Sequence, residues 1–353
     1  MSLIVRDLSK KYGEKTVVDH ISFQMNGPGV YALLGTNGAG KTTTIRMMLD
    51  MLEKDSGEVL WNDKPLSFTT CNIGYLAEER GLYPKYPIID QLRYFAKLRG
   101  VSDEVTEQRI RYWAERLNVE EYIFPGKAAT AEGTANAEGA APASNQAFGF
   151  HTGGSAVRVI STPRTAKTPV KKEKPRTPDQ LSKGNQQKIQ FMIAMISDPE
   201  LLILDEPFSG LDPVNSDILR SVIHEQIDAG KTIIMSSHQM PAVEEFCTDI
   251  TILHRSRAVV SGNLNEIKKS YGRINLSLKT EEDISAYARQ AGVTILNEKE
   301  HEYDIRVTGQ DQALDLLKLL VDNRICVVRF DLREPSLHEI FVKEVGADNE
   351  DQV

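Results

Sequence analysis

The chain has 353 residues, of which 41% are hydrophobic and 26% charged, as in ordinary soluble globular proteins. A formal net charge of −8 argues against a general nucleic-acid binder, which needs a basic surface. The length exceeds one compact core, so we expect two domains and an appendage.

No targeting or membrane segment is apparent in the sequence. Residues 1–7 are interrupted by polar side chains and do not resemble a signal peptide, and no apolar run approaches the roughly 18 residues of a membrane span. Cys71, Cys247 and Cys326 are far apart and predict reduced cytosolic thiols rather than disulfides or a metal site. We therefore expect a cytoplasmic chain that reaches a membrane only through a partner.

The chain begins with two predicted strands, over residues 3–8 and 17–23, around a turn at 11–14. Tyr12 lies in this turn, just before a nucleotide-binding motif. It is a candidate to stack on an adenine ring, and a tyrosine that only packs locally is the alternative.

The motif G-x-x-x-x-G-K-[ST] follows an apolar strand over residues 30–34 and precedes a predicted helix. Its glycines let successive N–H groups point at phosphate oxygens, and the helix adds its positive end. A lysine reaches the β- and γ-phosphates, and a hydroxyl binds Mg²⁺. The predicted nucleotide-binding residues are Gly35, Thr36, Asn37, Gly38, Ala39, Gly40, Lys41, Thr42 and Thr43.

Beyond this loop, residues 71–84 predict a strand that runs into a polar loop, with Glu78 where the strand ends. Helical periodicity then covers residues 89–123. Residues 124–179 are rich in Ala, Gly, Thr, Pro and Ser without a period, and predict a largely disordered insertion. Its second half is basic, so an inert loop and a segment that touches anionic lipid or an acidic partner both stay open. A short strand at 156–160 is a further alternative.

Order returns at residues 181–188, and a helix follows. The apolar run 201–204 then ends in Asp205 and Glu206, as expected of a Mg²⁺-nucleotide site at the carboxyl end of a strand. Asp205 would hold the metal, and Glu206 could polarise an attacking water. His238 ends another apolar strand over residues 231–237. Alone it would more often be structural, but its position at a strand end beside this machinery favours a functional role.

Two strands over residues 249–262 precede a change of character at Gly272. The order from there is strand, helix, strand, strand, helix, strand, which predicts a small α+β ferredoxin-like domain over 271–345 with a last helix at 336–345. The acidic tail, residues 346–353, should fray. We expect this domain to be regulatory or dimerising, without chemistry of its own.

The order and spacing of these motifs resemble an ABC-type ATP-binding subunit over about residues 1–265, apart from the insertion. The resemblance implies an α/β P-loop NTPase cassette with a helical subdomain, over residues 1–270. With the C-terminal domain, the chain is similar to a bacterial exporter subgroup that includes sodium-extrusion ATP-binding subunits. The motifs are the phosphate loop, Leu181-Ser182-Lys183-Gly184-Asn185-Gln186, Asp205-Glu206, the turn at 209–213 and His238.

The resemblance also implies a role for each matching residue. Tyr12 would stack on adenine, and Ser182 and Gly184 would reach the γ-phosphate of a second subunit's ATP. Asp212 would couple the two sites. The other implied roles are those of Glu206 as general base, His238 on the γ-phosphate, and Thr42, Glu78 and Asp205 at Mg²⁺.

Three features depart from the family pattern. Glu78 stands where many members have glutamine, which implies altered tuning of the metal site rather than its loss. Lys183 and Asn185 stand where the common signature has glycine and glutamine, while Ser182 and Gly184 are retained. The insertion ends just before the signature, in a helical region that normally touches the permease.

Three functions compete on these observations. The first is an ATPase subunit that binds ATP and Mg²⁺, dimerises with itself or a related subunit, and drives a separate membrane permease from the inner face of the membrane. The second is a soluble ABC-type ATPase of translation or DNA maintenance, although no second cassette or long coiled coil is visible. The third is a nucleotide sensor without turnover, against which Glu206 and His238 argue.

Overall fold

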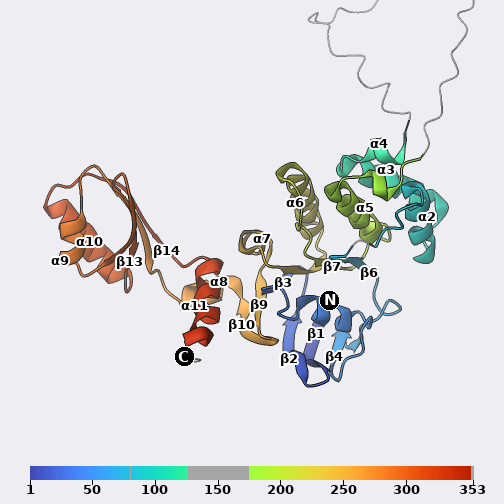
Figure 1. The fold of residues 1–353 in the computed structure, drawn as a ribbon, viewed down its shortest axis with the longest axis horizontal. Coiled ribbons are helices and arrows are strands. Elements are labelled where there is room, and N and C mark those ends of the chain that lie inside the picture. The colour runs from blue at the N-terminus through green and yellow to red at the C-terminus, as the bar shows by residue number, and fades with distance from the viewer. Residues whose placement is uncertain (80, 126–174, 351–353) are drawn as a thin grey trace, which may run out of the picture.

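The computed structural model describes residues 1–79, 81–125 and 175–350. Within this part, the strands form three sheets. The first is antiparallel, with the order β2-β1-β4-β5, and lies at the bottom of the view in Figure 1. Its strands are β1 (Leu3–Tyr12), β2 (Lys15–Met25), β4 (Ser56–Trp61) and β5 (Lys64–Pro65).

The second sheet positions the phosphate loop. It has the order β10-β9-β3-β8-β7-β6, and every neighbouring pair is parallel except β9 and β10. Its strands are β3 (Gly29–Gly35), β6 (Ile73–Leu76), β7 (Leu201–Asp205), β8 (Thr232–Ser237), β9 (Asp249–His254) and β10 (Arg257–Asn263).

Both faces of the second sheet are covered, which explains why its central strands are continuous apolar runs. In β3, Tyr31 and Leu33 pack with α1 (Lys41–Met48) and the first sheet, whereas Ala32 and Leu34 face the helices on the other side. Because successive side chains of a strand point to opposite faces, one run of residues fills two cores.

The helical layer consists of α2 (Ile88–Leu98), α3 (Asp103–Arg116), α4 (Glu120–Ile123), α5 (Lys183–Met195), α6 (Pro213–Asp228) and α7 (Met240–Phe246). The helical pattern predicted over 89–123 is confirmed but is divided into three helices. The chain turns at Gly100 and at Asn118, which both have positive φ, and Ser102 caps the start of α3. An edge-to-face contact between Trp113 and Phe191, with ring centres 6.0 Å apart, joins α3 to α5.

Most of the predicted insertion lies outside the described residues, including the alternative strand at 156–160. Its last residues are structured earlier than expected: Arg176 accepts a backbone hydrogen bond from Ile88, and residues Pro178–Gln180 form a short 3₁₀ helix. The chain therefore rejoins the fold beside the start of α2.

The predicted strand and helix order of the C-terminal region is confirmed. The elements are β11 (Asn275–Thr280), α9 (Ser285–Gln290), β12 (Thr294–Lys299), β13 (Glu302–Arg306), α10 (Gln310–Asp322) and β14 (Val327–Arg333). Their sheet is antiparallel with the order β12-β13-β11-β14. We call these elements the accessory domain, and everything from β1 to α8 (Leu264–Ser270) the main body.

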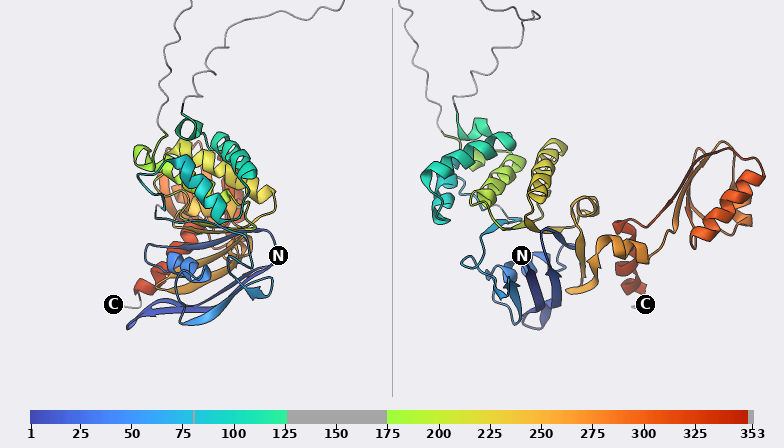
Figure 2. Two further views of the ribbon diagram at one scale, coloured as in Figure 1. Left: turned by 90° about the vertical axis from the view of Figure 1, so that its right-hand side faces the viewer. Right: turned by 180° about the vertical axis from the view of Figure 1, so that it is seen from behind.

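The last helix returns to the main body. α11 (Leu337–Glu350) places Leu337, Ile340 and Phe341 in the core that lies beneath the helical layer, so its packing partner is the main body. Figure 2 shows the two connections, one leaving from α8 and one entering α11. The helix also extends to Glu350, through part of the tail that was expected to fray.

Candidate functional site

The loop between β3 and α1 requires its glycines. Gly38 and Gly40 have φ of 82° and 107°, values that side chains rarely adopt. A Cβ on Gly40 would lie 2.6 Å from the carbonyl oxygen of Val17, which is backbone and cannot move aside cheaply. The loop therefore leads into the N-terminus of α1, whose backbone N–H groups form an anion-binding arrangement.

Lys41, the first residue of α1, is held over this loop. Its Nζ donates to the carbonyl oxygens of Gly35 at 2.9 Å and Thr36 at 3.3 Å. The same Nζ lies 3.2 Å from Oε1 of Glu206, and the two side chains are only 6% and 5% exposed. The cation is therefore directed to the mouth of the loop by three oxygens.

Glu206 and His238 come from the ends of neighbouring parallel strands, β7 and β8. Nδ1 of His238 lies 2.8 Å from Oε2 of Glu206, whose other oxygen faces Lys41. Glu206 has φ of 50°, a strained value that turns its carboxylate toward the loop. The His238 side chain is 44% exposed, so it contacts the carboxylate from the solvent side.

Asp205 is fully buried beside Thr42. Its Oδ1 accepts hydrogen bonds from Thr42 Oγ1, at 3.2 Å, and from Ser236 Oγ. Burial raises the pKa of Asp205; the two hydrogen bonds oppose this change, and the charges of Glu78 and Glu206 add to it. Its Oδ2 is buried and makes no hydrogen bond within the described part of the chain.

This donor set fits Mg²⁺. Mg²⁺ usually binds one or two carboxylates and completes its shell with phosphate oxygens and water. Oδ2 of Asp205 is an oxygen without a partner, next to the threonine hydroxyl. The described residues contain no cluster of three or more His, Cys, Asp or Glu side chains able to hold a metal, so an all-protein cage is not built there. Glu78 follows β6 and is exposed, within electrostatic reach of Asp205.

Sequence reasoning missed Ser236. Its Oγ donates to Asp205 and accepts a hydrogen bond of 3.0 Å from the backbone N–H of Glu206. It therefore holds the metal-site and base candidates together. The available signal was its position two residues before His238, at the end of β8. Because β8 pairs in parallel with β7, Ser236 lies directly beside Asp205.

The other predicted residues lie elsewhere within the single chain. Ser182 caps α5, and Asp212 caps α6 by accepting from Asn215 N at 3.0 Å. A Cβ on Gly184 would lie 3.0 Å from Asn215 Nδ2, so Gly184 and Asp212 share one neighbour. These residues lie at the starts of α5 and α6, two helices of the helical layer (Figure 1). Tyr12 ends β1 and is exposed, with Lys10 Nζ 5.7 Å from its ring centre.

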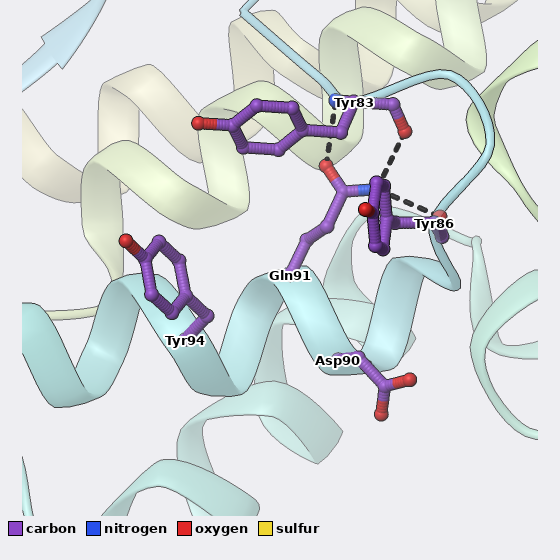
Figure 3. Close-up of a pocket in the computed structure, with 5 residues that line it drawn as sticks. All are labelled: Tyr83, Tyr86, Asp90, Gln91 and Tyr94. Atoms are coloured by element: carbon purple, nitrogen blue, oxygen red, sulfur yellow. Dashed lines mark hydrogen bonds between the residues drawn. The ribbon is translucent and has the colours of Figure 1, made fainter.

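A second hollow lies on the helical layer at the start of α2. It has a volume of about 430 Å³ and is lined by Tyr83, Tyr86, Asp90, Gln91 and Tyr94. Figure 3 shows Gln91 fixing the loop before α2: it accepts from Tyr83 N at 2.9 Å and donates to the carbonyl oxygens of Tyr83 and Tyr86. The three tyrosine rings are about half exposed. We call this hollow the tyrosine pocket.

None of the helices in residues 1–79, 81–125 and 175–350 combines the length and the apolar character needed to cross a bilayer.

Comparison with known families gives two matches. The family described as "ABC transporter" matches residues 18–209, and "ATP-binding protein DrrA1-3-like, C-terminal domain" matches residues 262–345. The second match includes the accessory domain and most of α11.

Individual relatives agree with these families. "Uncharacterized ABC transporter ATP-binding protein YhaQ" of Bacillus subtilis is 34% identical over 98% of this chain and 99% of its own length. "Bacitracin transport ATP-binding protein BcrA" of Bacillus licheniformis is 27% identical over 98% of both chains. A solved structure titled "Structure of ATP binding subunit of ABC transporter" shares the fold, with a TM-score of 0.58 at 24% identity, over 77% of this chain and 93% of that one.

Proposed function

Because the chain belongs to the ATP-binding proteins of ABC transporters, we propose that it energises export through a separate membrane permease, by closing two copies on two ATP molecules. Its ATPase role follows from the family. The direction of transport is supported by relatives such as the bacitracin transport protein. Peripheral attachment to the inner face of the membrane is part of the same proposal.

One observation carries the proposed hydrolytic mechanism: the Glu206 carboxylate lies between Lys41 and His238 in the nucleotide-free chain. An arriving γ-phosphate is a stronger partner for the Lys41 ammonium and for the His238 ring than this carboxylate is. Lys41 and His238 then turn to the phosphate, and Glu206 is released to orient a water and accept its proton during in-line attack.

The loop residues Gly35 to Thr43 bind the phosphates in this proposal, through backbone N–H groups and the start of α1. Thr42 and Asp205 hold Mg²⁺, with Glu78 near enough to add a carboxylate through water. When bound, Mg²⁺ neutralises charge that develops on the β- and γ-phosphates. Ser236 keeps Asp205 and Glu206 in place. Tyr12 provides an exposed ring for the adenine.

A second copy completes each site. Ser182, Gly184 and Asp212 lie together at the start of α5 and α6, rather than at their own chain's phosphate loop. The N-terminus of α5 is a second anion-binding helix end. Facing it toward the other copy's γ-phosphate gives two equivalent composite sites, and Asp212 lies where they meet.

The permease is proposed to dock at the tyrosine pocket. Three half-exposed rings around a hollow can accept an apolar side chain, and Asp90 on its rim favours a basic neighbour. We propose a short cytoplasmic helix of the permease as the occupant. The pocket lies where the resemblance places permease contacts.

Two finer assignments belong to the same proposal. The strand order of the accessory domain fits a ferredoxin-like topology. Sodium extrusion stays one substrate class among those that the exporter group could serve, because cargo is chosen by the permease. The alternative of a soluble ATPase in translation or DNA maintenance gains no support from the transporter names of the relatives.

The first test compares the purified wild type with Glu206→Gln. The variant should bind ATP and form a stable dimer with Mg²⁺, while turnover falls by about a hundredfold or more, because the general base is lost. Light scattering measures formation of the dimer, and phosphate release measures turnover. Equal turnover in both proteins would overturn the base assignment, and an ATP-bound monomer of Glu206→Gln would overturn the two-copy closure.

A further inference from the structure

Both connections to the accessory domain meet at one carboxylate. Oε1 of Glu244, in α7, accepts a hydrogen bond of 2.7 Å from the backbone N–H of Leu337, the first residue of α11. The same oxygen lies 2.6 Å from Nζ of Lys268, in the last turn of α8. The chain leaves the main body after α8 and returns at α11 (Figure 2). Glu244 therefore binds the departing and the returning segment together.

The returning segment is firmly attached. Leu337, Ile340 and Phe341 are buried in the core of the main body, and Tyr271, just after α8, donates through its hydroxyl to Glu344 in α11 at 2.5 Å. Because α11 is fixed to the main body, a rotation of the accessory domain cannot be taken up by movement of this helix. The rotation instead acts on the end of α8 and the start of α11, which Glu244 contacts.

The helix that carries Glu244 begins directly after His238. His238 follows β8, Gln239 is the residue before α7, and α7 starts at Met240. The end of α7 also contacts the segment that follows the general base: Phe246 stacks on Phe208, with ring centres 5.7 Å apart, and Glu245 pairs with Arg220 of α6. α7 therefore follows His238 after one residue, contacts Phe208 two residues beyond Glu206, and holds the accessory domain connections.

We propose that Glu244 is a positioning residue for His238, through which the accessory domain controls ATP turnover. The proposal rests on the function given above. Glu244 is too far along α7 to touch the reacting atoms, so it acts by setting where α7 begins. A position of the accessory domain that pulls on Lys268 and Leu337 moves α7, and with it the imidazole that faces the γ-phosphate.

Coupling of this kind is reciprocal. If the accessory domain biases His238, then a γ-phosphate bound by His238 biases the accessory domain through the same carboxylate. The alternative is that Glu244 only caps α11, with no influence beyond stability. The proposal and this alternative predict different results, because a cap of α11 would contribute the same stability whether or not His238 is present.

The first experiment is a double-mutant cycle. Glu244→Gln should lower kcat about fivefold or more with little change in KM, at the lower end of coupling between sites. In a His238→Ala background the same substitution should change the residual rate less than about twofold, because its target is gone. Glu225→Gln is the matched control: Glu225, in α6, pairs with Arg116 of α3. It should leave kcat unchanged.

A second readout does not depend on turnover. Cys326 is the exposed cysteine of the accessory domain, while Cys71 and Cys247 are buried. Spin labels on Cys326 and on an introduced Glu53→Cys, in the Glu206→Gln background and diluted with unlabelled chain, report the distance between the accessory domain and the main body. Mg-ATP should shift this distance distribution, and adding Glu244→Gln should remove the shift.

The outcomes separate the two proposals. Loss of ATP binding by the Glu206→Gln protein would contradict the proposed function. ATP binding with an unchanged label distance, an identical shift without the Glu244 carboxylate, or full additivity in the cycle would overturn this inference alone. If the Glu244→Gln protein folds poorly, Lys268→Met is the second variant, because it removes the partner of Glu244 in α8. It must give the same non-additivity with His238→Ala and the same loss of the distance shift.

Discussion

Lys41 and Glu206 form a buried ion pair across the mouth of the phosphate loop, with Nζ and Oε1 3.2 Å apart. The two residues are 165 positions apart in the sequence. Lys41 begins the helix after β3 and Glu206 follows β7, and β8 lies between these two strands in the sheet. Without nucleotide, each charge compensates the other. The site is therefore prepared for a ligand that replaces the carboxylate as the partner of Lys41.

Removal of one member should leave the other charge uncompensated. Lys41→Met is expected to lower the free energy of unfolding of the nucleotide-free chain by about 3 kcal/mol. The double variant Lys41→Met/Glu206→Gln should recover much of this loss, because no buried charge remains without its partner. Urea unfolding measures both. Lys54→Met, which breaks an exposed i,i+4 pair with Asp50, should cost about 0.5 kcal/mol or less. Equal effects of the Lys41 and Lys54 substitutions would contradict the buried pair.

The ionised carboxylate of Asp205 should lower the free energy of unfolding at neutral pH. Its pKa is raised by burial, so the folded chain binds a proton on Asp205 more readily than the unfolded chain does. Stability from this group is therefore present at low pH and is lost as pH rises through the raised pKa. Asp205→Asn should raise the melting temperature of the nucleotide-free protein at pH 7 while nearly abolishing Mg²⁺-dependent hydrolysis.

Calorimetry at pH 7 and pH 5 tests this prediction, with phosphate release as the activity readout. The stabilisation should shrink at the lower pH. A destabilised Asp205→Asn protein would show that burial does not disfavour the ionised carboxylate. Normal hydrolysis by this variant would show that the carboxylate is not needed for the metal.

Gly184→Ala should separate folding from dimerisation. The new Cβ would meet Asn215 Nδ2 at 3.0 Å, the end of a side chain, so the monomer can adjust. At the proposed composite site the same methyl group would stand between the start of α5 and the γ-phosphate. We expect normal ATP binding by the single copy and loss of the ATP-dependent dimer, measured by light scattering in the Glu206→Gln background.

The control for that substitution is Gly309→Ala, at the start of α10. Gly309 has extended backbone, and no atom lies within 4 Å of its added Cβ. Dimerisation should be unaffected there. A stable ATP-bound dimer of the Gly184→Ala protein would remove the start of α5 from the composite site.

Tyr86→Ala should weaken attachment to the permease without changing the soluble ATPase. Tyr86 lines the tyrosine pocket, is 64% exposed and lies outside the phosphate-binding residues. The fraction of the protein that sediments with membranes of producing cells should fall severalfold. Tyr112→Ala, on the exposed side of α3, should have no such effect. Equal sedimentation of both variants would argue for docking elsewhere.

Local patterns were sufficient for most of the strands and helices and for the position of the phosphate loop. The apolar runs that end at Gly35, Asp205 and Ser237 could be read as buried strands because strands covered on both faces need no polar alternation. The phosphate loop was readable because its backbone geometry demands glycine at set positions. Those requirements lie within a few residues of chain, so the sequence displays them directly.

What only the tertiary structure decided depends on contacts between distant segments. Ser236 carries no motif, and its role arose because β8 lies beside β7 and brings its hydroxyl between Asp205 and Glu206. The last helix was expected with the accessory domain by its place in the chain, yet its apolar face packs on the main body. Side-chain periodicity predicts which face of a helix is buried, but not which surface buries it. That choice is made by the free energy of the whole packing arrangement, and so Glu244 became visible as the meeting point of α7, α8 and α11 only in the folded chain.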